Sequence, residues 1–163
     1  MSCVARRLVL ILFITLTLGL SWNARAASTG NITLSGTVSA ATQIVVVPVA
    51  GFNNLDLATT KVDLAVASVN EINNTTNGYS VTATSTNAGL LKNGTLGSVT
   101  YTAKYNGSSF TLSTTPQTVT NSAATNVVVN LSKPLVISYT GIAPENLMVG
   151  NYTDTLTFTI TAN

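Results

Sequence analysis

The sequence of 163 residues contains no histidine and one cysteine, Cys3, and only 7% of its side chains are charged. Without histidine there is no Ser-His-Asp triad, and one cysteine cannot build a structural zinc site. The chain has neither a Walker-type phosphate loop nor a GxGxxG segment. Its five acidic residues stand singly, so a catalytic carboxylate pair would have to be assembled by the fold. We expect no enzymatic activity, no catalytic residues, no cofactor and no metal.

The first 26 residues have the layout of a secretory signal peptide. Arg6 and Arg7 precede the apolar run Leu8–Leu20, and an Ala-Arg-Ala triplet at residues 24–26 follows it. The run is too short for a transmembrane helix, which needs about 20 apolar residues. We therefore expect residues 1–26 to be a signal peptide that directs export to the periplasm, and a mature chain that starts at Ala27.

Cleavage would change the charge and the cysteine content. The basic isoelectric point of the whole chain, about 8.9, comes from three arginines within residues 1–26. Four lysines against five acidic side chains remain after residue 26, which gives a net charge of −1. Nucleic-acid binding is therefore not expected. Cys3 leaves as well, so the mature chain has no disulfide although its compartment would permit one.

The rest of the chain alternates apolar and polar residues with a period of two. Clusters of Asn, Gly and Thr separate the runs, and no stretch has the 3.6-residue period of a helix. Asn-Gly pairs such as Asn106-Gly107 supply the positive φ values that tight turns need. The pattern predicts nine strands: Asn31–Val38, Thr42–Val49, Lys61–Val69, Tyr79–Ser85, Ser98–Lys104, Ser109–Ser113, Asn126–Leu131, Leu135–Tyr139 and Tyr152–Thr161.

Strands at this spacing favour an all-β fold, an immunoglobulin-like β-sandwich in one domain. Apolar residues on one face of each run define the predicted core: Ile44, Val46, Val62, Leu64, Val66, Tyr79, Val81, Val99, Tyr101, Val127, Val129, Leu135, Ile137, Leu156, Phe158 and Ile160. Tyr101, Tyr105 and Phe110 could instead line a sugar-binding face, but packing in the core or across strands is favoured.

The two ends of this region alternate most regularly. The segment Asn31–Val38 places Ile32, Leu34, Gly36 and Val38 on one face. The final run places on one face Tyr152, Leu156, Phe158 and Ile160, interrupted only by Asp154, and it places threonines on the other. We expect each of these two strands to bury one face only.

These ends resemble a known family. The opening Gly30-Asn-Ile-Thr-Leu-Ser-Gly-Thr-Val-Ser-Ala-Ala-Thr-Gln43 resembles the start of mature chaperone–usher pilins, and Gly150-Asn-Tyr-Thr-Asp-Thr-Leu-Thr-Phe-Thr-Ile-Thr161 resembles their closing strand. Gln43 stands where type 1-like pilins have a cysteine, so the chain is most similar to cysteine-free alternate, or colonisation-factor type, pilins. Its ending is also similar to spore coat protein U-type domains. The resemblance covers both ends and the general β pattern between them.

The resemblance implies an incomplete sandwich that is completed by donor-strand exchange. In such pilins a periplasmic chaperone first fills an open groove, and the N-terminal strand of the next subunit replaces it at the outer-membrane usher. Residues 27–41 would then be the donor-strand segment, and residues 42–163 the pilin-type sandwich. The donor side chains would be Ile32, Leu34 and Val38, with Gly36 allowing close backbone approach. The wall of the acceptor groove would be formed by Tyr152, Leu156, Phe158 and Ile160.

We therefore expect a structural subunit of a surface fimbria, or pilus, that supports cell adhesion or biofilm formation. Its partners would be identical or related pilin subunits, a periplasmic chaperone, an outer-membrane usher and a host or abiotic surface. An alternative stays open, in which Asn31–Val38 is the first strand of its own sheet. The chain would then be a secreted adhesin or carbohydrate-binding module with a self-complete sandwich.

Overall fold

The computed structural model describes residues 27–163, and the predicted signal peptide at residues 1–26 lies outside the described residues. Residues 37–163 form one compact unit, and residues 27–36 belong to a separate unit. Residues 27–41 carry no strand and are exposed throughout. Among residues 27–163, no helix is long and apolar enough to cross a membrane.

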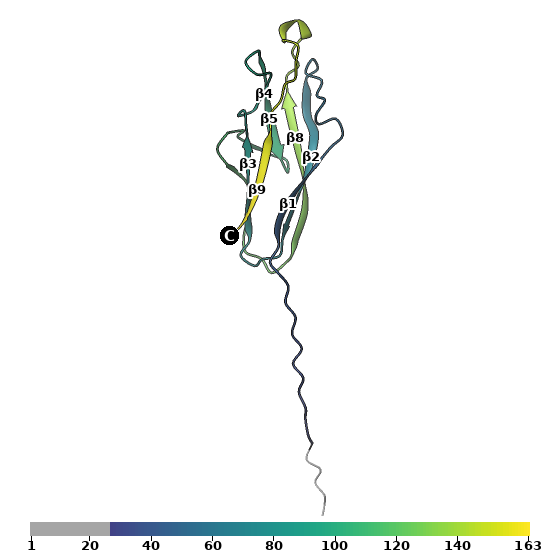
Figure 1. Cartoon of the computed structure of the whole chain (residues 1–163), viewed down its shortest axis with the longest axis vertical. Helices are drawn as coiled ribbons and strands as arrows, with labels where there is room; N and C mark the ends of the chain where they lie inside the picture. Colours follow the sequence, from purple (N-terminus) through teal and green to yellow (C-terminus); the bar gives the residue numbers. More distant parts are fainter. Residues whose placement is uncertain (1–26) are drawn as a thin grey trace, which may run out of the picture. The chain divides into compact units, whose positions relative to one another are not determined.

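The compact unit is all-β, as the alternation predicts (Figure 1). Its elements are β1 (Thr42–Pro48), β2 (Lys61–Asn73), β3 (Tyr79–Ser85), β4 (Leu90–Lys92), β5 (Ser98–Tyr105), β6 (Ser108–Phe110), β7 (Gln117–Ser122), β8 (Val129–Tyr139), the short 3₁₀ helix η1 (Pro144–Asn146) and β9 (Leu156–Ala162). The larger sheet has the order β1-β2-β8-β5-β4, with β6 also pairing with β5, and the smaller sheet has the order β7-β3-β9. All pairs are antiparallel, and the buried core has a β-sandwich-like arrangement.

The strand predictions differ from the structure at several places. Asn31–Val38 is not a strand, and the first strand of the sheet is β1. The predicted strand Tyr152–Thr161 begins only at Leu156, because Thr153 pairs with Lys92 at the edge of the other sheet. The sequence pattern did not predict β4 or β7. β4 has only 3 residues, and β7 is rich in threonine and asparagine.

The predicted strands Asn126–Leu131 and Leu135–Tyr139 form a single strand, β8, which continues through Pro134. A proline cannot donate to a ladder, so it normally marks an edge or a strand end. Pro134 pairs with Ser68 of β2 on one side, but β5 ends opposite Leu135 on the other. Its carbonyl there accepts from the backbone of Asn106. The proline therefore lies where β8 is locally an edge, and no ladder hydrogen bond is lost.

The core lies between the sheets and contains most of the predicted residues, for example Tyr79, Val81, Val99, Tyr101, Leu135, Ile137 and Phe158. Three predictions are wrong, since Val46, Val62 and Val127 are 44%, 76% and 70% exposed. Val46 lies on the uncovered strand β1, and Val127 lies in the loop before β8. Val62 precedes a bulge at Asp63, where a φ of 50° shifts the alternation by one residue.

Two tight turns depend on glycine, for different reasons. Gly107 has a φ of 80° and open space where a Cβ would lie, and it closes the β5–β6 hairpin together with Asn106. Gly78 has a φ of 84°, and a Cβ there would lie 2.2 Å from the carbonyl oxygen of Ser122. Gly78 therefore serves both the turn into β3 and the close approach of β7.

Replacing Gly78 should destabilise the fold more than replacing Gly107. We expect Gly107→Ala to cost about 1 kcal/mol, the ordinary penalty of a left-handed alanine. Gly78→Ala should cost roughly 3 kcal/mol or more, because the added methyl group also pushes two backbone segments apart. Urea unfolding of both variants measures the difference, and equal costs would contradict the close approach of β7.

Candidate functional site

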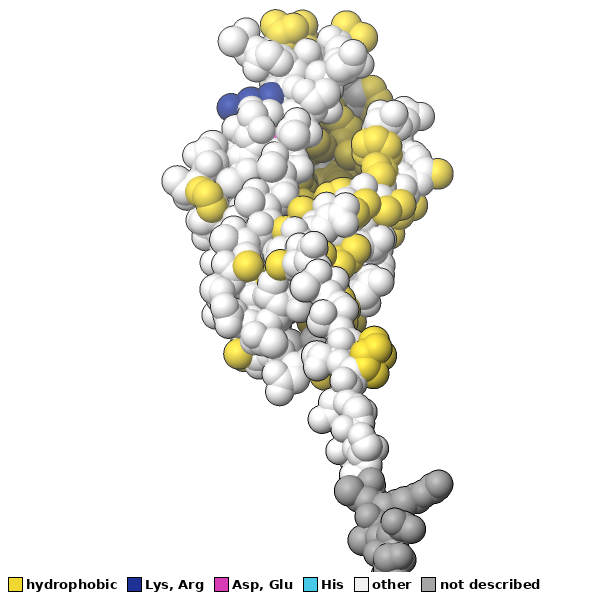
Figure 2. Space-filling model, turned by 60° about the horizontal axis from the view of Figure 1, so that its bottom comes forward, with side chains coloured by type: hydrophobic (Ala, Val, Ile, Leu, Met, Phe, Trp, Pro, Cys, Tyr) yellow, Lys and Arg dark blue, Asp and Glu magenta, His cyan; other side chains and the backbone are white. Residues whose placement is uncertain are grey.

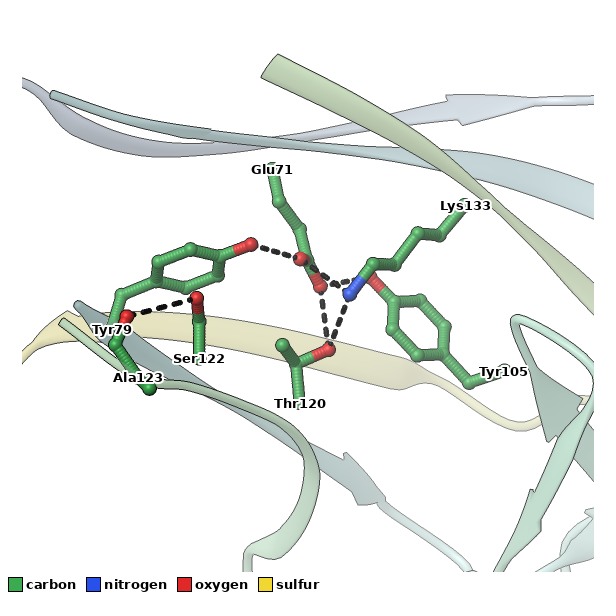
Figure 3. Close-up of polar contacts among 7 residues, drawn as sticks. All are labelled: Glu71, Tyr79, Tyr105, Thr120, Ser122, Ala123 and Lys133. Atoms are coloured by element: carbon green, nitrogen blue, oxygen red, sulfur yellow. Dashed lines mark hydrogen bonds and ion pairs between the residues drawn. The ribbon is translucent and has the colours of Figure 1, made fainter. Parts of the chain in front are cut away.

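Five polar side chains converge between the two sheets (Figure 3). Glu71 of β2 is completely buried and pairs with Lys133 of β8 at 2.7 Å. Its carboxylate also accepts from the hydroxyl groups of Tyr79 at 2.8 Å, Tyr105 at 2.6 Å and Thr120 at 2.8 Å. Tyr79 and Thr120 belong to the smaller sheet and the other three to the larger. These residues, the Glu71 cluster, therefore join the two sheets across the core.

Hydrogen bonding sets the protonation of the Glu71 cluster. Burial alone would raise the pKa of Glu71, but bonds from Lys133 and the three hydroxyl groups outweigh burial and lower the pKa below its usual 4.5. Burial, reinforced by the bond to Glu71, raises the pKa values of Tyr79 and Tyr105 above their usual 10.0. At neutral pH the carboxylate is thus ionised and both phenols keep the protons that they donate.

The Glu71 carboxylate at the centre of the cluster is saturated and closed to solvent. Lys133 Nζ also donates to Thr120 Oγ1 at 2.9 Å and lies 5.6 Å from the centre of the Tyr105 ring. Within residues 27–163, no buried side-chain nitrogen or oxygen is left without a partner. A carboxylate with four partners and no exposed surface has no lone pair to offer a ligand. We conclude that this cluster stabilises the sandwich.

A different feature is open to solvent, a mostly apolar groove of about 320 Å³ between β1 and β9. Figure 2 shows a hollow lined by hydrophobic side chains on the face in view. The sides of this β1–β9 groove include Val46 and Pro48 of β1 and Leu156 and Phe158 of β9. Its floor comes from the other strands of the larger sheet: Val66, Ala67, Tyr101, Leu135 and Ile137.

The groove lies between two strand edges that no strand of residues 27–163 covers. β1 pairs only with β2, and β9 pairs only with β3, although β1 and β9 are neighbours. Side chains on both faces of β1 are accordingly exposed, with Val45, Val46 and Val47 at 37%, 44% and 47%. Unpaired edges beside apolar surface are a template for another strand. This arrangement can therefore bind an extended segment with alternating apolar side chains.

Asp154 fixes the start of β9 at one end of the groove. Its carboxylate accepts from Ser85 Oγ at 2.5 Å, from Tyr101 Oη at 2.6 Å and from the backbone N–H of Asn87 at 2.9 Å. Burial and the bond to Asp154 raise the pKa of Tyr101. Asp154 therefore ties the chain to both sheets where it crosses from β4 to β3. The sequence showed this residue only as an interruption of an apolar face.

The predicted groove-wall residues occupy different places. Leu156 and Phe158 line the β1–β9 groove, and Phe158 also stacks on Tyr105 with ring centres 5.4 Å apart. Ile160 is half-buried against the core. Tyr152 lies outside β9 and lines a second hollow of about 520 Å³, where its hydroxyl donates to the Met148 carbonyl at 2.9 Å.

The predicted donor residues are exposed. Ile32, Leu34 and Val38 are 84%, 85% and 90% accessible, and Gly36 has no atom within 4 Å of an added Cβ. Sequence reasoning did not identify the groove side chains that come from β1, β2 and β8, because residues far apart in the chain form that floor. It did not identify Phe52 and Leu55 either, which follow β1 and also line the groove.

The sugar-binding face is the alternative site that the sequence left open. Tyr101 and Tyr105 are buried, so they cannot form a sugar-binding face. No group of three or more metal-ligating side chains occurs in the part of the chain that the structure describes.

No family model matches the chain, and a search of curated proteins finds no significant match.

The Glu71 cluster predicts a broad pH plateau of stability. The pKa of Glu71 is lower in the folded state, so its stabilisation is present above about pH 4.5 and is lost as the pH falls through the folded value. The pKa values of Tyr79 and Tyr105 are higher in the folded state, so their contribution declines only above about pH 10. The free energy of unfolding, measured with urea from pH 2 to 11, should change little between about pH 5 and 10. A free energy of unfolding that changes steeply between pH 6 and 9 would contradict this prediction.

Lys133→Met should destabilise the protein by about 3 kcal/mol or more, because it leaves a buried carboxylate without its cation. Glu71→Gln combined with Lys133→Met removes both charges. The double variant should therefore lose less stability than the sum of the losses in the two single variants. Lys104→Met is a matched control, since Lys104 pairs with Asp63 at the surface and should contribute less than about 1 kcal/mol. Equal losses for Lys133→Met and Lys104→Met would show that the buried pair is not required.

Proposed function

We propose that the protein is a structural subunit of a surface fimbria that polymerises by donor-strand exchange. The observation that carries the proposal is the open apolar groove between the uncovered edges of β1 and β9. Residues 27–41 of a second copy are the occupant that fits it. They present Ile32, Leu34 and Val38 at alternate positions, exposed and without a strand partner.

The strand order supports an immunoglobulin-like sandwich that lacks its seventh strand. In the seven-stranded form, strands A, B, E and D make one sheet and C, F and G the other. The order β1-β2-β8-β5 corresponds to A-B-E-D, and the pair β3-β9 corresponds to C-F. Strand G would lie beside the free edge of β9, and no strand of residues 27–163 lies there.

The energies involved suit a partner that adds a strand. Burial of Ile32, Leu34 and Val38 would contribute about 1.5–3 kcal/mol each. Ladder hydrogen bonds to the free edge of β9 would contribute roughly 0.5–1.5 kcal/mol each. Together these terms approach the whole stability of a small domain, about 5–15 kcal/mol. A subunit without a donor would be marginally stable, and we propose that a periplasmic chaperone protects it until an outer-membrane usher exchanges the strands.

A head-to-tail contact of this kind does not close on itself. Each copy would offer one donor segment and one groove, so the assembly would grow as a fibre. Such a fibre, exported to the cell surface, would serve attachment or biofilm formation. The absence of cysteine after residue 26 means that its cohesion would rest on strand insertion alone.

A second candidate function is favoured by the hollow beside the groove, which is lined partly by Phe52, Asn53, Asn54, Asn151 and Tyr152. Side-chain amides next to aromatic rings are groups that bind sugars by hydrogen bonds and apolar contact. The chain would then be an adhesin or carbohydrate-binding module. Binding of a glycan by the isolated monomer, abolished by Asn151→Ala, would favour this function over the structural one.

The donor proposal is tested with a chain truncated to residues 42–163 and a synthetic peptide of residues 27–41. A hundredfold excess of peptide over its Kd should stabilise the truncated chain by about 2.7 kcal/mol, or roughly 10 °C in Tm. A peptide carrying Leu34→Asp should have little effect, because it would bury an unpaired carboxylate.

Polymerisation of the exported full chain gives the second readout. Light scattering should show fibres for the unchanged chain and monomers for the Leu34→Asp variant, whose sandwich sequence is intact. A full chain that stays a stable monomer, with a Tm that the peptide does not shift, would rule out donor-strand exchange.

A further inference from the structure

Under the proposed function, on which this inference rests, the donor segment can enter the groove of its own chain or that of another copy. A segment tethered directly to β1 has an effective concentration of about 1 mM for a groove on its own chain. At micromolar protein concentration, insertion into its own groove would therefore be favoured about a thousandfold over insertion into the groove of another copy. A fibre can form only if entry into the same chain's groove is disfavoured.

The side chain of Asn74 holds the chain just before β1. The backbone N–H of Ala41 donates to Asn74 Oδ1 at 2.6 Å, and Asn74 Nδ2 donates to the carbonyl of Ser39 at 2.9 Å. The backbone N–H of Asn74 also donates to the carbonyl of Ala41 at 3.0 Å. The β1–β2 ladder ends at the pair Thr42–Asn73. Asn74 therefore continues the ladder for three residues and keeps residues 39–41 in line with β1.

Entry into the groove of the same chain requires the opposite geometry. The groove runs along β1, so a segment that precedes β1 must reverse its direction at residues 39–41 to lie there. That reversal would break both side-chain bonds to Asn74. The sequence Ser39-Ala40-Ala41 also has no glycine or asparagine to adopt positive φ values, whereas the β5–β6 hairpin of this chain uses Asn106 and Gly107 with φ values of 49° and 80°.

We infer that Asn74 is a positioning residue that directs the donor segment away from its own groove and toward that of another copy. Loss of the side chain should shift strand insertion from between chains to within one chain. The shift should be about tenfold, since each of the two lost bonds is worth a factor of roughly 2–10.

Crosslinking distinguishes the two routes. The full chain carrying Cys3→Ser, Thr33→Cys and Thr159→Cys is exported, purified at one micromolar concentration and treated with a flexible bis-maleimide. Thr33 is at the centre of the donor segment and the exposed Thr159 at the centre of β9, so the crosslink forms whichever direction the strand takes. Insertion between chains gives a ladder of oligomers on a denaturing gel, and insertion within a chain gives a crosslinked monomer.

Asn74→Ala should raise the ratio of intrachain to interchain crosslinks about tenfold. Asn74→Asp, which keeps the acceptor for Ala41 and loses the donor to Ser39, should give an intermediate ratio. Ala40→Asn with Ala41→Gly should raise the ratio independently, because it introduces a turn sequence. Asn77→Ala is the matched control, since Asn77 is an exposed residue of the same loop whose side chain makes no hydrogen bond in residues 27–163.

Two of the remaining outcomes overturn the role of Asn74 alone, and a third also overturns the proposed function. A ladder that forms in all variants with an unchanged ratio would overturn the role of Asn74 and leave donor-strand exchange standing. An equal rise for Asn77→Ala would assign the effect to the loop in general and overturn the role of Asn74. The absence of any crosslink between positions 33 and 159 in every variant would overturn both this inference and the proposed function.

Discussion

The buried carboxylate of Glu71, held by Lys133 within its own sheet and by Tyr79 and Thr120 of the other, is the group on which the open sandwich depends. Two sheets that are not closed along one side can slide or separate there, because apolar contacts have no preferred direction. The Glu71 cluster fixes their relative position through directed, charge-assisted bonds from both sheets. Asp154 does the same beside the groove, through Ser85 and Tyr101. The protein can therefore keep a solvent-open groove without losing the register of its sheets.

Open edges are normally a hazard, and this chain limits the hazard to one place. Lysine, proline or a bulge usually protects an edge strand from pairing with other chains. The outer edge of the smaller sheet is β7, whose residues Gln117–Ser122 are almost entirely polar. β1 instead presents three consecutive valines beside the groove, and proline occurs only at its end. The contrast between the two edges supports the proposal that the β1–β9 opening receives an inserted strand.

The alternation of the sequence was sufficient for the all-β class and for strands such as β3 and β5, because each buries one face along its whole length. It failed where tertiary structure overrides the period of two. Val62 is exposed because of the bulge at Asp63, and β8 passes through Pro134 because its neighbour ends there. The groove was predictable only along β9. Its floor and the Glu71 cluster gather residues from distant strands, and a single sequence carries no signal of that proximity.

The polar side of the donor segment gives an argument separate from its apolar side. On the outer face of the smaller sheet, Thr82 and Thr84 of β3 pair with Thr159 and Thr157 of β9, and no charge interrupts them. If Ile32, Leu34 and Val38 enter the groove, the alternation turns Thr33, Ser35 and Thr37 to this same outer face. An inserted strand would thus extend both surfaces of the sheet, apolar inside and hydroxyl-bearing outside. A segment that only had to be soluble would need neither the apolar inner face nor the hydroxyl-bearing outer face. The presence of both supports the proposal that this segment pairs with β9.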